Sequence, residues 1–512
     1  MSLSGIDPSE KLNVSSATGL AVLAVVCVAQ FFGVLNASAV GVVLPTIGED
    51  LSVEPGLLGW LMTGFLLVYA VAIPFYGRLA DLFGARRLFL LGVSLFSIGS
   101  LLAVFAPTFS TLLFARFVQA IGGAAVPGLG MVLASRAYPV ERRGAVLGVI
   151  GMTIGVGAGV GPLLGGALSD AFGWQAIFVV TALAALTVPV GLKVLPADEQ
   201  QEAEQLDVVG GLLLALTVGG ALLAVTEGAR SGWLSPLVIA GAASAALAPV
   251  ALVARQRIAR FPFIPLEFLR NSRLLALLGI SFAVMAANLA PLVGLPLLLT
   301  GLYDQSPVQI GLILLPGAML TGVLGLTAGR LVDRIGVLRP MRFGLPLMMV
   351  GLLCLSTFAD ASVVAISGFV AMLGGGFALV NTPVAAAVSF VVRPQRLASA
   401  LSMNSMLFFL GGSFGTGLLI AISTGRSGES ALNPLHTGAA AGYSDGFLLL
   451  ALFVVVALGL SFAVPSRLRL QAAEGVPSVS DQPLALEWVA DCSIPWTPEC
   501  VGAAGAKASG VS

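Results

Sequence analysis

Arg116 is the one formally charged residue that the sequence places well inside an apolar run, because all 25 acidic residues fall in termini, in loops or at the ends of such runs. The single histidine, His436, falls in a polar stretch. Burying a charge in a membrane costs at least about 2.5–3.5 kcal/mol on insertion scales, so Arg116 is a candidate functional residue. Without an acid at its depth, it needs carbonyl groups, Gln119, Asn36, water or a bound anion as partners. It is therefore either a structural arginine bonded to the backbone of the run 18–46 or a group that attracts an anionic or zwitterionic solute.

Four more polar residues fall at mid-depth in apolar runs, and each either lines a cavity or makes a helix–helix hydrogen bond worth about 0.6 kcal/mol. They are Gln30, Asn288, Asn381 and Asn404. A membrane-embedded enzyme would need clustered acids, histidines or cysteines at one depth, which this pattern does not supply. No Gly-Lys-Ser/Thr phosphate loop is present, which argues against ATP-driven transport.

A dense series of glycines marks the apolar run 144–169. Glycines let a neighbouring helix approach closely. A proline inside a helix leaves a carbonyl without its usual partner and permits a bend. The pattern predicts either a hinge or a packing seam without a hinge role. Its members are Gly148, Gly157, Gly161, Pro162, Gly165 and Gly166.

One sequence pattern occurs twice, as GRLADLFGARR from Gly77 and as GRLVDRIGVLR from Gly329. Glycines allow a tight turn between helices, and an aspartate can cap a helix start or pair with nearby arginines. We predict a loop that carries a latch, which breaks when the two copies move apart; the alternative is a basic loop that only sets membrane orientation. The residues concerned are Gly77, Arg78, Asp81, Gly84 and Arg87 in the first copy, and Gly329, Arg330, Asp333 and Gly336 in the second.

Together these segments resemble the fourteen-helix drug:proton antiporter family of the major facilitator superfamily. Gly77–Arg87 resembles the superfamily's signature between helices 2 and 3, and Gly148–Gly166 resembles the antiporter signature of helix 5. Leu112–Ala125 resembles the helix 4 motif, with Arg116 as its arginine and Ala120 in place of one glycine. The resemblance implies the major facilitator fold.

The first apolar run departs from the family pattern. Leu35–Pro45 resembles the helix 1 motif of the fourteen-helix group, but Asn36 stands where the family usually has an aspartate associated with proton coupling. The resemblance also implies that Arg116 takes part in a transport relay. Protons, if coupled, would then need an edge acid such as Glu227 or Asp445, or the substrate's own carboxylate.

The elements that position these residues follow from composition. The 512 residues are 57% hydrophobic and 10% charged, with a mean hydropathy of +1.01. Soluble domains carry about 25% charged residues, and a membrane-spanning helix needs about 20 apolar residues. Fourteen apolar runs of that length are present, so an all-α integral membrane protein is expected. The predicted helices are 18–46, 56–75, 87–106, 109–134, 144–169, 174–195, 207–227, 235–255, 273–301, 306–331, 341–359, 362–389, 398–424 and 444–465.

Charge placement orients this plan. An even number of spans puts both termini on one side, where 22 of the 25 lysines and arginines then fall; two fall on the other side. The positive-inside rule therefore predicts that both termini are cytoplasmic. Richness in alanine and glycine with few lysines is typical of GC-rich bacterial genomes, which favours a plasma membrane.

The repeat predicts two six-helix halves with an inserted helix pair between them, a known transporter plan. The expected divisions are a cytoplasmic N-terminus (1–17), an N-terminal half (18–195), an acidic linker with two inserted helices (196–256), a C-terminal half (257–465) and a disordered cytoplasmic tail (466–512).

The resemblance and the fourteen-helix plan predict a secondary transporter that exports amphiphilic organic compounds or antibiotics by proton antiport. The alternative is an exporter of an acidic or zwitterionic metabolite, which uses Arg116 without a conventional membrane carboxylate. We expect a monomer in the lipid bilayer with a small-molecule substrate and protons as partners. No cofactor, metal ion or nucleic acid is expected, and the zero net charge gives no electrostatic case for the last.

Overall fold

A computed structural model of the chain describes residues 16–53, 55–139, 142–198, 207–259, 262–264, 266–305, 307–360, 362–426, 430–436, 438 and 440–464. This part of the chain holds 14 helices long and apolar enough to cross a membrane, which confirms the predicted number. Its regular elements are all helical. The predicted tail and most of the acidic linker lie outside the described residues, so the expected disorder of the tail stays a prediction.

The helix bounds follow the apolar runs closely. The predicted helix 109–134 consists of two segments that meet at Ala124, and the last helix of the first half contains a 3-10 turn. The elements are α1 (Ser16–Asp50), α2 (Pro55–Leu58), α3 (Trp60–Phe83), α4 (Ala85–Val104), α5 (Phe109–Gly123), α6 (Ala125–Arg136), α7 (Arg143–Phe172), α8 (Gln175–Ala182), η3 (Leu183–Leu186), α9 (Thr187–Val194), α10 (Val208–Ser231), α11 (Pro236–Ile258), α12 (Leu266–Arg270), α13 (Ser272–Tyr303), α14 (Pro307–Ile335), α15 (Leu338–Thr357), α16 (Val363–Val391), η4 (Pro394–Arg396), α17 (Leu397–Gly425) and α18 (Ala441–Ser461).

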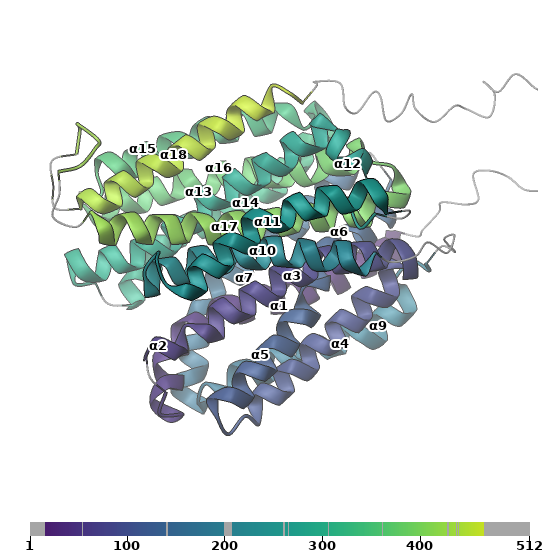
Figure 1. The fold of residues 1–512 in the computed structure, drawn as a ribbon, viewed down its shortest axis with the longest axis horizontal. Helices are drawn as coiled ribbons and strands as arrows, with labels where there is room; N and C mark the ends of the chain where they lie inside the picture. The colour runs from purple at the N-terminus through teal and green to yellow at the C-terminus, as the bar shows by residue number, and fades with distance from the viewer. Residues whose placement is uncertain are drawn as a thin grey trace, which may run out of the picture. The chain divides into compact units, whose positions relative to one another are not determined.

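Two groups of helices face each other. Figure 1 draws α1, α4, α5 and α9 on one side, and α13, α15, α16 and α18 on the other. Across the boundary α7 packs along α14, and α17 packs against α3 and α6. We call α1–α9 the first half and α13–α18 the second half. By contacts the chain divides into Met1–Leu468 and Arg469–Ser512, so both halves belong to one compact unit, and the residue boundaries expected for them stay a prediction.

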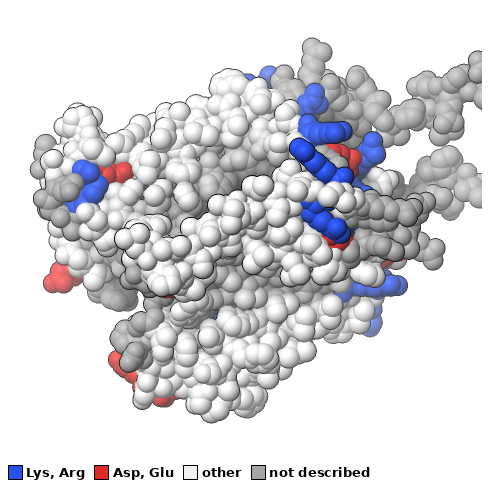
Figure 2. Space-filling view, viewed as in Figure 1, with Lys and Arg blue, Asp and Glu red and all other residues white. Residues whose placement is uncertain are grey.

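Lysines and arginines gather at one end of the helices (Figure 2). Arg136, Arg255 and Arg334 lie in the last turns of helices that end there. We call this the basic end. The opposite end carries the outer connections, where Arg426 forms an ion pair of 2.7 Å with Asp445.

The prediction that the repeated pattern forms a loop is wrong. Most of each copy completes a helix, since α3 runs to Phe83 and α14 runs to Ile335. Only Gly84 and Gly336 make the turns, with φ angles of 96° and 83° that favour glycine. Each aspartate of the repeat therefore lies in the last turn of a helix rather than in a loop.

Candidate transport site and gate

Arg116 lies in a buried shell of neutral polar groups inside the first half. It is 0% exposed, and its Nη1 donates to Asn36 Oδ1 and to Gln119 Oε1, each at 2.5 Å. Its Nε donates to the carbonyl oxygen of Leu61 at 3.3 Å, so the backbone partner comes from α3 and not from the first helix. Two of the partners named from the sequence therefore contact the guanidinium directly.

A second layer of hydrogen bonds holds those partners in place. Gln119 Nε2 donates to the Ser100 hydroxyl at 2.7 Å, and Asn36 Nδ2 donates to the Thr181 hydroxyl at 3.3 Å. The hydroxyls of Thr181 and Ser100 are themselves 3.3 Å apart. Helices α1, α4, α5 and α8 thus close a ring of polar contacts. Ser100 and Thr181 could not be predicted from the sequence, because a lone hydroxyl inside an apolar run gives no signal of its own.

No carboxylate balances this buried charge among the described residues, whose ion pairs all lie elsewhere. The guanidinium instead stacks 4.0 Å from the centre of the Phe65 ring, a favourable cation–π contact. One nitrogen, Nη2, is buried without a hydrogen-bond partner. The cluster therefore holds a positive charge that only dipoles and a ring stabilise.

Aromatic rings connect this cluster to the second half. Phe65 stacks on Tyr69 with ring centres 5.6 Å apart, and Tyr69 meets Phe409 of α17 edge-on at 5.0 Å. Phe409 continues to Phe408, and Phe408 to Phe377 of α16. A continuous aromatic path thus runs from the arginine across the boundary between the halves.

The other four polar candidates are not hydrogen-bonded to Arg116 in the described part of the chain. Asn404 Oδ1 accepts from the Ser281 hydroxyl at 2.6 Å, which is a helix–helix bond within the second half. Gln30 is 4% exposed with its Oε1 unpartnered, Asn288 is 8% exposed, and Asn381 is half-buried. Their assignment to the substrate pathway stays a prediction.

The second copy of the repeat reaches across to the first half. Asp333 accepts hydrogen bonds from the backbone N–H groups of Gly144 at 3.0 Å and Ala145 at 2.8 Å. These are the first residues of α7, whose own N-cap, Arg142, makes no side-chain cap. A carboxylate is disfavoured in the last turn of its own helix but favoured at a helix start. The position of Asp333 in α14 is therefore explained by its contact with α7, and we call this contact the second latch.

The first copy makes the corresponding contact in the opposite direction. Asp81 of α3 accepts from the hydroxyl and the backbone N–H of Ser399, in the first turn of α17. Arg78 and Arg396 interact electrostatically with this carboxylate. We call this contact the first latch. Asp81 does not cap the next helix in its own half; Asp198 does so, accepting from the N–H groups of Arg86 and Arg87 at 2.9 and 3.2 Å.

Close backbone approach accompanies each latch. A Cβ at Gly77 would lie 2.5 Å from the Ser402 side chain of α17, and a Cβ at Gly329 would clash with the Gly144 carbonyl. Two other arginines of the repeat, Arg87 and Arg330, are exposed. The two copies therefore place equivalent glycines and aspartates against opposite halves, at the basic end of the molecule.

Comparison with known proteins identifies the family of this chain. The family model described as Major Facilitator Superfamily matches residues 26–416. The chain belongs to the major facilitator superfamily. It is 30% identical over 387 residues to the multidrug resistance protein Stp of Mycobacterium tuberculosis, covering 75% of this chain and 72% of Stp. It is 26% identical over 380 residues to the riboflavin transporter RibZ of Clostridioides difficile, covering 73% of this chain and 82% of RibZ.

A solved structure supports the fold of this superfamily member. The crystal structure of the human organic anion transporter MFSD10 (TETRAN) superposes with a TM-score of 0.59 at 17% identity. The match covers 85% of this chain and 99% of that one. At this level of identity the likeness concerns the fold alone.

The glycines of α7 in this superfamily member serve two different contacts. Gly148 faces the second half, where an added Cβ would lie 2.7 Å from the Gly325 carbonyl of α14. Gly157, Gly161 and Gly165 face α1 of the same half; a Cβ at Gly165 would lie 2.9 Å from Ala39. Gly166 meets nothing within 4 Å. Helix α7 runs unbroken through Pro162, which is exposed, and a hinge role there stays a prediction.

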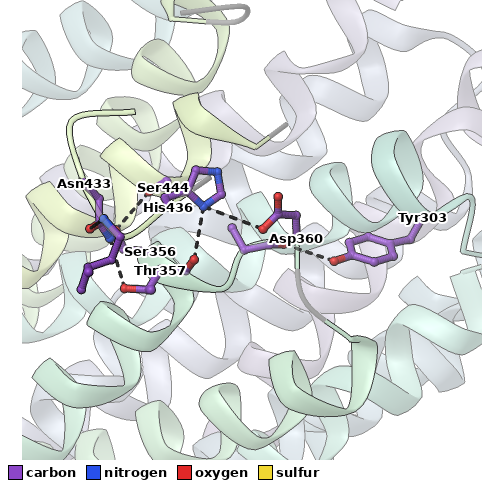
Figure 3. Close-up of polar contacts among 9 residues, drawn as sticks. Tyr303, Ser356, Thr357, Asp360, Asn433, His436 and Ser444 are labelled. Carbon is purple, nitrogen blue, oxygen red and sulfur yellow. Dashed lines mark hydrogen bonds and ion pairs between the residues drawn. The ribbon is translucent and has the colours of Figure 1, made fainter. Parts of the chain in front are cut away.

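A polar cluster at the opposite end of the second half was not predicted as a unit (Figure 3). His436 is buried, with Nδ1 3.3 Å from the Thr357 carbonyl oxygen and 3.8 Å from Asp360. Asn433 Nδ2 donates to Ser356 at 2.9 Å and to Thr357 Oγ1 at 3.1 Å. The loop between α17 and α18 is thereby attached to the end of α15.

Proposed function

We propose that this transporter exports amphiphilic organic compounds across a bacterial plasma membrane by alternating access, with proton antiport as the energy source. The proposal places the basic end in the cytoplasm, in accord with the positive-inside rule. Membership of the major facilitator superfamily supports small-molecule transport, and the name of the relative Stp supports drug-like substrates.

The observation that carries the proposal is the pair of latches. Asp333 of the second half holds the start of α7, and Asp81 of the first half holds the start of α17. Both contacts join opposite halves at the basic end, so a central cavity in this state would be closed toward the cytoplasm. Exposure of that cavity to the cytoplasm would require both latches to break, which is the motion that alternating access needs.

The test is transport into everted membrane vesicles that contain the protein, with a pH gradient imposed across the membrane. Accumulation of an amphiphilic fluorescent substrate should rise with the gradient and collapse when an uncoupler is added. Asp333→Asn is the loss-of-function control, and Arg334→Gln, which changes the exposed neighbouring residue, is the matched variant that should retain activity. Accumulation that ignores both the gradient and the uncoupler would remove proton antiport from the proposal and leave the transporter.

A second candidate function is export of an acidic or zwitterionic solute. The buried Arg116 favours it, because no carboxylate of the described chain balances the guanidinium and its Nη2 has no partner. An anion near Phe65 and Tyr69 would gain from that unbalanced charge, since Coulomb interactions are strong where water is excluded. In this case the substrate's own carboxylate would carry the proton that the chain has no mid-membrane acid to carry.

A further inference from the structure

The inserted helix pair, α10 and α11, lies outside the repeat, and the proposed function assigns it no task. Its two helices pack closely through small residues: a Cβ at Gly220 would lie 2.7 Å from the Gly241 carbonyl oxygen. Helix α11 packs mainly on α10, and Leu247 and Val250 on its free face are 69% and 68% exposed. Contact with the rest of the transporter therefore runs through α10.

Helix α10 contacts both halves. Near its basic end, a Cβ at Gly211 would lie 2.8 Å from the Phe75 ring of α3, and one at Gly219 would lie 3.4 Å from Val71 of α3. Two turns further along, Val225 packs directly on Gly417 of α17. One face of α10 between these points is buried, with Leu214, Val218 and Leu222 5%, 2% and 2% exposed. Helix α10 thus crosses the seam where α3 of the first half meets α17 of the second.

The base of the pair is attached beside the first latch. Asp207 caps α10 and pairs with Arg255 at the end of α11, 3.2 Å away, which closes the base of the hairpin. In the segment after α11, the Phe263 ring lies 5.1 Å from the Phe75 ring of α3. Glu267 of α12 lies 3.9 Å from Arg396, the arginine that also interacts with the carboxylate of the first latch.

We propose that α10 together with residues 262–264 and 266–270 forms a strap that holds the α3–α17 seam closed, so that the two seams between the halves open unequally during transport. The main packing partners of α10 outside the pair are α3 and α17. The α7–α14 seam instead consists of facing backbones, as at Gly148 and Gly325. The residues that position the gate, meaning the two latches at the basic end, are then Val225, Phe263 and Glu267. This inference rests on the proposed alternating access, although its test needs no substrate.

The test measures the two seams separately by electron–electron distance spectroscopy on the full chain in lipid nanodiscs, in a background whose four native cysteines are replaced. Spin labels at Phe83 and Gln395 report the α3–α17 seam, and labels at Arg142 and Ile335 report the α7–α14 seam; all four positions are exposed. The strap variants are Val225→Ala, Phe263→Ala and Glu267→Gln, and their control is Leu247→Ala on the free face of α11.

The strap variants should raise the long-distance population of the α3–α17 pair by roughly fivefold, the lower end of typical coupling between sites, and leave the α7–α14 pair unchanged. Leu247→Ala should change neither. Glu267→Gln removes only an ion pair, so it keeps the test valid if Phe263→Ala folds poorly in a thermal unfolding check. Equal lengthening at both seams, or none at either, would overturn the strap. Absence of transport in vesicles, with the unequal distance change present, would count against the proposed function alone.

Discussion

At the scale of single residues, the transporter stabilises a buried cation without an anion from the described part of the chain. Three oxygen atoms accept from the Arg116 guanidinium, one each from Asn36, Gln119 and the Leu61 backbone, and Phe65 covers one face. Neutral acceptors can satisfy the hydrogen bonds of a guanidinium but cannot cancel its charge. The charge therefore remains unbalanced among the described residues, and varying the charge of the substrate tests whether a solute interacts with it.

Two substitutions at Arg116, one that keeps the positive charge and one that removes it, distinguish a structural arginine from one that attracts substrate. If the charge attracts substrate, Arg116→Gln should lower export of an acidic fluorophore at least about tenfold, a loss of about 1.4 kcal/mol, and affect a cationic dye much less. Arg116→Lys should retain part of the acidic export, because the ammonium keeps the charge but cannot form the same fork of bonds. Initial rates in everted vesicles, normalised to folded protein, provide the measurement.

The matched control is Ser281→Ala, which removes a buried polar contact of the second half that lies outside the Arg116 cluster. It should affect acidic and cationic substrates equally. Equal loss of both substrate classes in Arg116→Gln, with Arg116→Lys no better, would mean that the arginine is structural and would rule out the acidic-substrate candidate.

At the scale of helices, the sequence predicted the spans well and their ends less well. Apolar length alone fixes where a membrane helix must exist, so all fourteen helices were identified. The ends depend on partners distant in sequence. Polar Arg78 and Asp81 looked like loop residues, yet α3 continues to Phe83 because Ser399 of the other half accommodates the carboxylate. Similarly, no local pattern could reveal that Asp198 caps α4.

The loop between α17 and α18 illustrates the same limitation at the opposite end. Its polar residues are typical of a solvent-exposed connection, but Asn433 and His436 are buried against α15 (Figure 3). Asn433 is the central residue, because its side-chain oxygen accepts from Leu435 N at 3.0 Å while its Nδ2 holds Ser356 and Thr357. The described part of this loop is therefore held in part by a side chain that a sequence pattern would class as a turn residue.

Asn433→Ala should consequently loosen this loop selectively. The Leu435 amide loses its acceptor, and removing the buried amide costs roughly 1–3 kcal/mol of local stability, so its hydrogen exchange should accelerate at least about fivefold. The Leu432 amide, which donates to Asp445 at 2.6 Å, should change less. Residue-resolved hydrogen exchange in detergent measures both amides.

The control is Leu435→Ala, which changes a side chain that is 72% exposed and should leave the loop's exchange unchanged. Uniform acceleration of both amides in Asn433→Ala would contradict this account.

At the scale of the whole molecule, two halves meet along two seams that differ in construction. The α7–α14 seam relies on backbone contact between glycines, whereas the α3–α17 seam adds aromatic rings at Tyr69 and Phe409 and the crossing helix α10. The glycine motif of α7 could be identified from sequence, but its division between a face toward α14 and a face toward α1 could not. Which side of a helix meets which neighbour is a property of the assembled bundle.

The different surroundings of the glycines of α7 give a prediction and its control, because Gly148 faces α14 whereas Gly166 meets nothing within 4 Å. Gly148→Ala puts a methyl group 2.7 Å from the Gly325 carbonyl, and backbone cannot move aside as a flexible side chain can, so the halves must separate at this seam. The cytoplasm-closed state should lose stability by about 1–3 kcal/mol, the usual cost of overpacking. Transport should fall at least about tenfold, and a cysteine placed at Ile335 should react faster with a water-soluble maleimide.

The control is Gly166→Ala, because a Cβ at this position meets nothing within 4 Å, so this variant should transport and react like the parent protein. Similar transport in the two variants would show that the α7–α14 contact does not govern the closed state, and would remove that seam from the gate.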